Sequence, residues 1–236
     1  MRTPDEPGAA ARPPSRRTSA ETREHILAVA ARLFYAEGIR ATGVDTVASR
    51  AEVAPTTLYR LFDSKDDLVA AYVERCSSRY KAALGTAMSS AAPTPPGKIL
   101  AIIDAFADDV QSPACRGCPF LMVLAEYPDP DTAAHAKAVA HKAWVRDLFH
   151  ELVAELALTT ELRDAESLAD GLVLLAEGMY GSVQALGPSG PVTYGRACAE
   201  ALIDAAQRAP DRATGPPATD SSMEIKPSRE SAPGDR

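Results

Sequence analysis

The chain reads GIRATGVDTVASRAEVAPTTLYRLFDSKDDLVAAYVE from residue 38 to residue 74, and our interpretation of the whole fold starts from this segment. Within it, residues 44–50 and 55–61 each carry apolar side chains at helical spacing, and only residues 51–54 separate them. Pro55 suits the first position of a helix, where its missing N–H needs no partner. Two short helices joined by a tight turn form a helix-turn-helix, whose second helix enters the major groove of DNA.

Longer helices are expected on both sides of this motif. Residues 19–37 have one apolar face and end at Gly38, a residue that commonly stops helices. Residues 64–88 form the next helix, with Ser64 as its N-cap. The apolar face of the first helix consists of Ile26, Val29, Ala30, Leu33 and Phe34.

The remaining residues also show helical patterns, and we find no strand-like alternation in them. A break rich in proline occupies residues 92–97. Further helices are expected at residues 97–111, 118–127, 130–158, 163–187 and 191–208. The predicted fold class is therefore all-α, with about nine helices in a three-helix N-terminal head and a helical C-terminal body.

Both ends of the chain are predicted to be disordered. Residues 1–18 are rich in Pro, Arg, Ala and Gly, and residues 210–236 are polar with several prolines. Such segments bury too little apolar surface to offset the entropy that ordering would cost.

Charge is distributed unevenly along the chain. The net charge is −7, of which residues 1–80 contribute +1 (12 basic, 11 acidic) and the remainder −8 (13 basic, 21 acidic). An acidic body with a mildly basic head is typical of a protein that binds a polyanion through its head alone.

The sequence contains neither a bilayer-spanning apolar segment nor the apolar central region of a secretory signal at its N-terminus. We therefore expect a cytoplasmic protein without membrane contact. Its four cysteines are then expected to be thiols rather than a disulfide framework.

Order, spacing and residue type over three helices resemble the N-terminal signature of TetR-type (TetR/AcrR) transcriptional regulators. The resemblance covers about 60 residues, 19–80, and implies a DNA-binding domain there. It also implies a ligand-binding and dimerisation domain at residues 81–209. The shared features are Gly38, Thr42, Val47, Ala48, Thr57, Leu58, Tyr59, Phe62, Ser64, Lys65 and Leu68.

The resemblance also implies roles for side chains of the head. Thr42, Tyr59 and Lys65 would contact phosphates. Base edges or the adjoining backbone would be approached by Pro55, Thr56, Thr57 and Arg60, and Arg40 completes the predicted DNA-binding set.

Two positions depart from the family pattern. Glu52 stands in the turn where glycine is common, and Ala54 stands where a capping serine or threonine is common. A positive φ at Glu52 would cost about 1 kcal/mol or more, and a missing cap costs about 1 kcal/mol. We expect slightly lower local stability and intact function.

In the body, the resemblance implies an internal ligand site and a dimer contact on the last two helices. The helix at residues 165–186 is apolar on more than one face, as a helix buried on two sides should be. Gly171, Gly178 and Gly181 would admit a partner helix closely. The candidate ligand-binding residues are Phe106, Val110, Phe120, Leu124, Tyr127, Trp144, Met179 and Tyr180, each of which could also be ordinary core.

The CRGCP segment at residues 115–119 is the most chemically suggestive feature outside the head. A helix N-terminus and Arg116 both favour a thiolate at Cys118, so Cys115 and Cys118 are redox candidates. Structural thiols are the alternative that we favour, partly because residues 117–130 resemble a segment of one TetR subgroup. A zinc site needs about four ligands, and no second CxxC is present, so no metal is assigned.

The predicted function is that of a ligand-responsive homodimer that binds a near-palindromic operator in double-stranded DNA. A small-molecule effector would bind the body and release the operator, which makes the chain a repressor; activation is the other mode. A helical protein-interaction adaptor and a thiol-based redox sensor are the alternatives. Catalysis and cofactors are not expected, because recognised catalytic motifs are missing around His135, His141, His150, Asp131 and Glu151.

Overall fold

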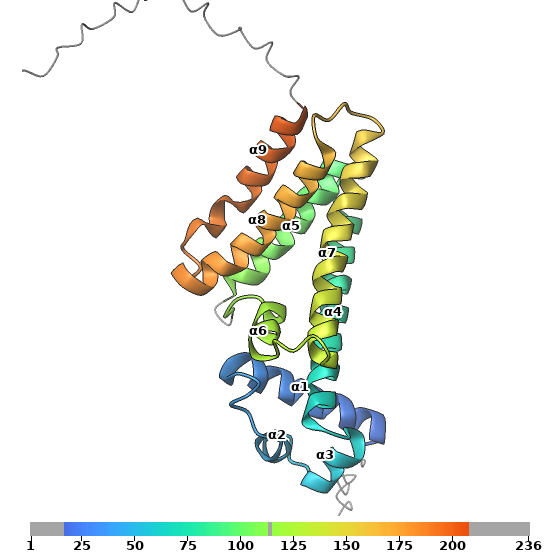
Figure 1. Cartoon of the computed structure of the whole chain (residues 1–236), viewed down its shortest axis with the longest axis vertical. Helices are drawn as coiled ribbons and strands as arrows, with labels where there is room; N and C mark the ends of the chain where they lie inside the picture. Colours follow the sequence, from blue (N-terminus) through green and yellow to red (C-terminus); the bar gives the residue numbers. More distant parts are fainter. Residues whose placement is uncertain (1–16, 113–114, 208–236) are drawn as a thin grey trace, which may run out of the picture.

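The computed structural model describes residues 17–112 and 115–207, so the predicted disorder of residues 1–18 and 210–236 lies almost entirely outside it. The described residues form nine α-helices and one 3-10 helix (Figure 1), and none of these helices is long and apolar enough to cross a membrane. The elements are α1 Ser19–Glu37, α2 Val44–Arg50, α3 Pro55–Leu61, α4 Lys65–Ser90, α5 Pro95–Gln111, α6 Pro119–Glu126, α7 Ala133–Ala157, α8 Ala165–Leu186, η1 Pro191–Tyr194 and α9 Gly195–Gln207.

The head consists of α1, α2, α3 and the start of α4, packed around a small apolar core. Ile26 and Ala30 of α1, Val47 of α2 and Leu58 of α3 are fully buried. Phe34 at the end of α1 meets Tyr72 of α4 edge to face, with ring centroids 5.5 Å apart. These contacts fix the two short helices, which would be too short to hold their shape alone.

The body is a helical bundle that α4 enters from the head. Figure 1 shows α4 running alongside α7, with α8 and α9 side by side; α8 packs against α7 as well as α5, and α9 packs against α8 and α5. The short helix α6 lies between the head and the rest of the body. The predicted boundary at residue 80 falls within α4, so one continuous helix belongs to both parts, and the domain limits stay a prediction.

The predicted helices agree with the structure within a few residues, and α1, α2 and α3 have the predicted limits. One difference is the segment 191–208, which begins as the 3-10 helix η1 before α9 starts at Gly195. A Cβ at Gly195 would lie 2.9 Å from the sulfur and terminal methyl of Met179, so the chain passes close to α8 there. The tighter 3-10 turn brings the chain onto α8 at this point.

Candidate DNA-binding surface and effector cavity

The helix α3 has one buried side and one exposed side. Leu58 is fully buried, whereas Tyr59 is 50% exposed, the largest exposure of any large apolar or aromatic side chain of the head. Pro55, Thr56 and Arg60 are also exposed, and Thr57 is half-buried. The structure therefore brings the predicted recognition residues together on one accessible helix, with a core residue between them.

The turn between α1 and α2 holds two further residues of the predicted set. Arg40 is exposed, but Thr42 is 1% exposed and its hydroxyl donates to the carbonyl oxygen of Gly38 at 2.7 Å. The Thr42 side chain therefore stabilises the turn. Its contact with phosphate stays a prediction, and the backbone N–H is the group suited to make it.

The turn between α2 and α3 contains both departures from the family pattern. Glu52 has a φ of 55°, the left-handed conformation that a glycine adopts without strain. Ala54 is the N-cap of α3 and supplies no side-chain hydrogen bond. The structure thus has the positive φ at Glu52 and the missing cap at Ala54. The expected lower local stability stays a prediction.

Replacing Glu52 with glycine should stabilise the protein. Relief of the left-handed strain is worth about 1 kcal/mol, which raises the melting temperature by about 2–4 °C in a chain of this size. The check is thermal unfolding of the wild type, Glu52→Gly and the control Glu52→Ala. The alanine variant removes the charge but keeps the strain, so an equal gain in both variants would show that charge, not backbone conformation, limits stability.

Glu126 at the end of α6 binds the head through its carboxylate. One oxygen accepts the backbone N–H of Ile39 at 2.9 Å, and the other accepts that of Arg40 at 2.6 Å. The Arg40 Nε donates in return to the backbone carbonyl of Glu126 at 2.8 Å. We call this set of three bonds the Glu126 clamp; no sequence signal marks it, because its partners are backbone groups 86 and 87 residues away.

A second connection joins the end of α1 to the segment before α6. The Tyr35 hydroxyl donates to the carbonyl oxygen of Gly117 at 2.9 Å and accepts the backbone N–H of Arg116 at 2.7 Å. The Arg116 guanidinium donates to the carbonyl oxygens of Tyr35 and Ala36. Both ends of α6 are thus attached to the head.

A small cavity of about 20 Å³ lies inside the body beside α6. Three of the eight predicted ligand residues, Phe106, Phe120 and Tyr180, line it. The other five, Val110, Leu124, Tyr127, Trp144 and Met179, lie elsewhere in the core or at the head–body junction. The full lining is Tyr80, Phe106, Cys118, Phe120, His141, Lys142, Val145, Ala176, Glu177 and Tyr180.

His141 is the most unusual residue of this cavity. It is 4% exposed, and its ring stacks on that of Phe120 with centroids 3.6 Å apart and 13° between the planes. Its Nδ1 lies 3.1 Å from the Ser77 hydroxyl. Burial, together with Lys142 and Lys81, lowers the pKa of His141 to about 4, so the ring is neutral near pH 7.

The sequence carries a signal for the burial of His141. The buried positions of α7 include Ala134, Ala138, His141, Val145 and Phe149, which recur at three- and four-residue spacing. A polar residue inside such an apolar stripe must find a partner or face a cavity, since burying an unbonded polar group is costly.

The remaining polar groups of the cavity are already paired with one another. The hydroxyls of Tyr80 and Tyr180 donate to the Asp109 carboxylate at 2.7 and 2.8 Å. Burial is the main cause that raises the pKa of both tyrosines above the ordinary value. Lys142 forms an ion pair with Glu177 at 2.7 Å.

The cysteines near α6 are partly or fully buried. Cys118 is 3% exposed and lines the cavity, and Cys115 Sγ lies 3.7 Å from the Tyr35 hydroxyl. Burial raises the pKa of the neighbouring Cys76 to about 11, which keeps it a thiol. Redox sensing by Cys115 and Cys118 stays a prediction.

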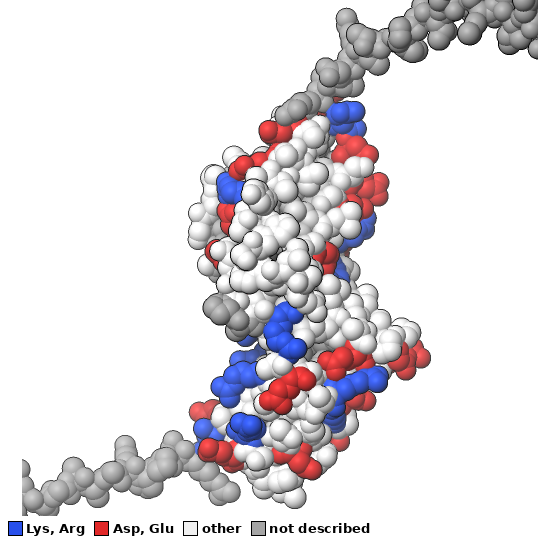
Figure 2. Space-filling view, turned by 90° about the vertical axis from the view of Figure 1, so that its left-hand side faces the viewer, with Lys and Arg blue, Asp and Glu red and all other residues white. Residues whose placement is uncertain are grey.

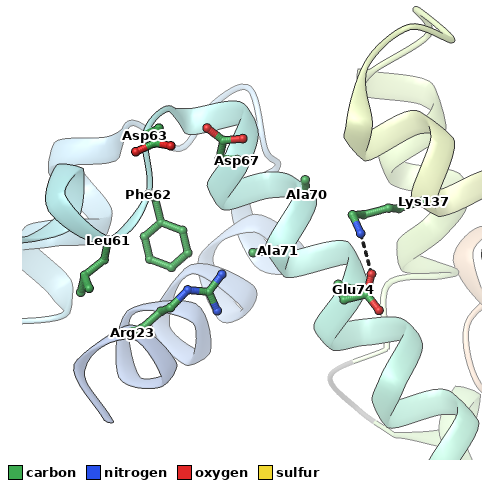
Figure 3. Close-up of a pocket in the computed structure, with 9 residues that line it drawn as sticks. All are labelled: Arg23, Leu61, Phe62, Asp63, Asp67, Ala70, Ala71, Glu74 and Lys137. Atoms are coloured by element: carbon green, nitrogen blue, oxygen red, sulfur yellow. Dashed lines mark hydrogen bonds and ion pairs between the residues drawn. The ribbon is translucent and has the colours of Figure 1, made fainter. Parts of the chain in front are cut away.

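A second hollow, an open groove of about 410 Å³, lies between the head and α7 (Figure 3). Arg23 stacks over the Phe62 ring at 4.8 Å, and Lys137 reaches across to Glu74 at 2.6 Å. Small-molecule sites are usually enclosed and mostly apolar. The internal cavity beside α6 is therefore the candidate effector site.

The last two helices present a face that none of the residues 17–112 and 115–207 covers. We define the α8–α9 outer face by exposed residues at helical spacing: Leu174, Gly178, Gly181 and Ala185 on α8, and Ala197, Ala201 and Ala205 on α9. Figure 2 shows that the body is largely uncharged on this side. By contrast, a Cβ added at Gly171 would lie 3.8 Å from the side chain of Leu202 on α9, so this glycine faces a helix of its own protomer rather than a partner.

A helix-turn-helix head attached to a helical body with an internal cavity defines a class of DNA-binding transcriptional regulators. Residues 26–72 match the model of the bacterial regulatory proteins of the tetR family, and residues 95–199 match that of the tetracyclin repressor-like C-terminal domain. The chain belongs to the TetR family of transcriptional regulators.

Individual relatives agree with this assignment. The TetR-family transcriptional regulator SCO4454 from Streptomyces coelicolor has 32% identity and a TM-score of 0.74, over 80% of this chain and 97% of that chain. The HTH-type transcriptional regulator YjdC from Escherichia coli (strain K12) is 28% identical over 66% of this chain and 80% of its own length. A TetR-family regulator from Cytophaga hutchinsonii, at 20% identity and a TM-score of 0.71 over 80% and 96% of the two chains, shares the fold.

Proposed function

We propose that the protein is a homodimeric repressor that binds a near-palindromic operator and releases it when a small molecule occupies the body. The observation that carries the proposal is the position of α6. Its first residues line the cavity, and its last residue holds the head through the Glu126 clamp. A ligand in the cavity can therefore act on the DNA-binding head through one short helix.

The dimer proposal is supported by the α8–α9 outer face. Small side chains at helical spacing let two helices approach closely, and two copies of the face would form a four-helix contact. Two recognition helices would then lie about one DNA turn apart, roughly 34–36 Å, on successive major grooves. The DNA partner would place this activity in the cytoplasm, and no cofactor or catalysis is needed for it.

Release of the operator requires a ligand that binds one conformation more tightly than the other. A coupling of about 1–3 kcal/mol would weaken operator binding by about 5–150-fold. This range sets the size of the response that an effector should produce.

Removing the Glu126 carboxylate should reduce both operator affinity and the response to effector. In Glu126→Ala the backbone N–H groups of Ile39 and Arg40 lose their acceptor. We expect about tenfold weaker operator binding, because a head free to reorient must be ordered on DNA, corresponding to about 1.4 kcal/mol. Fluorescence anisotropy with labelled operator measures the change.

The matched control for this variant is Glu37→Ala. Glu37 is exposed at the C-terminal end of α1, and its side chain forms no hydrogen bond or ion pair with the residues that the structure describes. The control removes the same charge without touching the Glu126 clamp. Equal weakening in both variants would attribute the effect to charge and contradict the proposed role of the clamp.

The experiment that tests the proposed function is selection of bound fragments from random and genomic DNA, followed by titration at two salt concentrations. An enriched near-palindrome with a steep salt dependence supports a sequence-specific dimeric regulator. Absence of enrichment, and of binding even at low salt, would contradict it and leave the helical adaptor as the better interpretation.

A further inference from the structure

The cavity beside α6 is too small for an effector as it stands. Its volume of about 20 Å³ is close to what a single water molecule requires. Any larger molecule must displace part of the wall. The identity of the displaced group therefore indicates which ligand chemistry the site accepts.

Most of the polar wall is tied in place by hydrogen bonds. Tyr80 and Tyr180 are held by Asp109, and Lys142 is held by Glu177. His141 is anchored through its Nδ1 to Ser77.

Two large wall residues, Phe106 and Phe120, are held by packing alone, and only Phe120 lies on a short helix. It belongs to α6, which has only eight residues and lacks a side-chain hydrogen bond at its N-cap, Cys118. Its ring is nearly parallel to that of His141, at 3.6 Å. Phe120 is therefore the group that an entering molecule can displace, and a flat ring can replace it on His141.

We propose that the effector is an uncharged, planar aromatic compound with a hydroxyl group that takes the place of Phe120 on the ring of His141. This proposal rests on the proposed function and specifies the ligand of the same site. The four rings of Tyr80, Phe106, His141 and Tyr180 that remain around the position favour an aromatic occupant, because aromatic pairs attract one another beyond their shared apolar area.

We infer that the effector is uncharged because the charged groups of the cavity are already paired. Lys142 is neutralised by Glu177. Asp109, which accepts the two phenol hydroxyls, is exposed and does not line the cavity. His141 is neutral, since burial lowers its pKa to about 4. An ionic ligand would find no free opposite charge, and burial of an unpaired charge is strongly unfavourable.

We infer that the effector carries a hydroxyl group because one ring nitrogen of His141 has no hydrogen bond within the described residues. Nδ1 is bonded to Ser77, while Nε2 forms no hydrogen bond within residues 17–112 and 115–207. The one fully buried side-chain nitrogen or oxygen without a partner in those residues is Arg75 Nε, so Nε2 of His141 keeps some accessible surface for a ligand. Whether Nε2 carries the proton depends on the tautomer. A phenolic hydroxyl can both donate and accept, so it satisfies Nε2 in either case.

Replacement of Phe120 by the effector would also couple effector binding to the position of the head. Phe120 lies in the first turn of α6 and Glu126 ends the same helix. Moving Phe120 out of the cavity displaces α6 and with it the carboxylate that holds Ile39 and Arg40.

The test is calorimetric titration of the full chain with three probes of similar size: 4-methylphenol, 4-methylcyclohexanol and 4-methylbenzoate. The phenol should bind about tenfold or more tightly than its saturated and anionic counterparts, a difference of about 1.4 kcal/mol. Equal or tighter binding of either counterpart, or no binding of the phenol up to its solubility limit, would overturn the proposal.

Variants of the stack make the test specific. His141→Leu should weaken phenol binding about tenfold, whereas Phe120→Ala should strengthen it about tenfold because no ring has to leave, each about 1.4 kcal/mol. Phe120→Leu, which removes the ring but keeps most of the volume, repeats the measurement should the alanine variant unfold. Leu121→Ala is the control, since Leu121 is 42% exposed on the same helix and should leave binding unchanged.

Operator release is measured separately with each probe. Phenol binding without release would contradict the proposed function and leave the ligand class intact. Operator release caused by a probe of another class would support the proposed function and contradict the proposed ligand class. Unchanged phenol affinity in both Phe120 variants would show that the ring exchange does not occur.

Discussion

Gly178→Arg is expected to leave the chain folded but monomeric, and to weaken operator binding by about 100-fold or more. Gly178 lies on the α8–α9 outer face, and a Cβ added there meets nothing within 4 Å in the protomer. The substitution removes a helix-interior glycine, which stabilises the isolated α8 by up to about 1 kcal/mol. In a dimer, however, a buried unpaired guanidinium is strongly unfavourable.

Operator binding should fall because a monomer engages only one half-site. Joining two heads makes the second contact intramolecular, and this gain of about 100-fold or more is lost with the dimer. Light scattering coupled to gel filtration measures the mass, and anisotropy measures the affinity.

The chain offers a closely matched control for this variant in Gly85→Arg. Gly85 is also inside a helix, α4, and a Cβ there also has nothing within 4 Å. This variant should remain dimeric and bind operator normally. A dimeric Gly178→Arg protein would show that the subunits associate through another surface, whereas loss of the dimer in both variants would remove the specific role of the α8–α9 outer face.

The second large effect is expected for Tyr59→Ala, which should abolish detectable operator binding while the dimer stays intact. Tyr59 is half exposed on α3, and the resemblance to the family assigns its hydroxyl to a phosphate. A hydrogen bond to a charged group is worth about 1.5–3 kcal/mol, and a symmetric dimer loses two of them. The loss of affinity is therefore about 100-fold or more at constant salt.

Stability and oligomeric state are the controls for this variant, because Tyr59 contributes little to the core of the head. Lys65→Ala provides a useful comparison, since loss of one phosphate contact by a cation per head should also flatten the salt dependence. Lys98→Ala removes a positive charge from the body, where Lys98 pairs with Glu155, and should change neither property. Survival of operator binding in Tyr59→Ala would mean that α3 is not the recognition helix.

The sequence allowed accurate prediction of the head because its signals are local. Pro55 begins α3, Ser64 caps α4, and Gly38 follows the last residue of α1. The positive φ at Glu52 is implied by the resemblance to the family, which commonly has glycine at this position, and the structure has it. Each of these features depends on neighbours within a few residues.

The contacts that join the head to the body could not be predicted in the same way. The Glu126 clamp and the hydrogen bond from Tyr127 to Asp66 connect residues more than sixty positions apart, through groups that have no distinctive pattern in the sequence. Likewise, only three of the eight proposed ligand residues line the cavity, since the apolar character of Val110 or Met179 is the same in a core as in a pocket.

Because α4 is one continuous helix, its length determines how far the head moves when the helix tilts. Its 26 residues span about 39 Å at 1.5 Å per residue. If one end stays fixed, a tilt of about 5° displaces the other by about 3 Å, as follows from that length. Two subunits tilting in opposite directions would change a separation of roughly 34–36 Å by about 6 Å, nearly the rise of two base pairs. An angular change too small to disturb the packing of the body would thus put both recognition helices out of phase with the double helix.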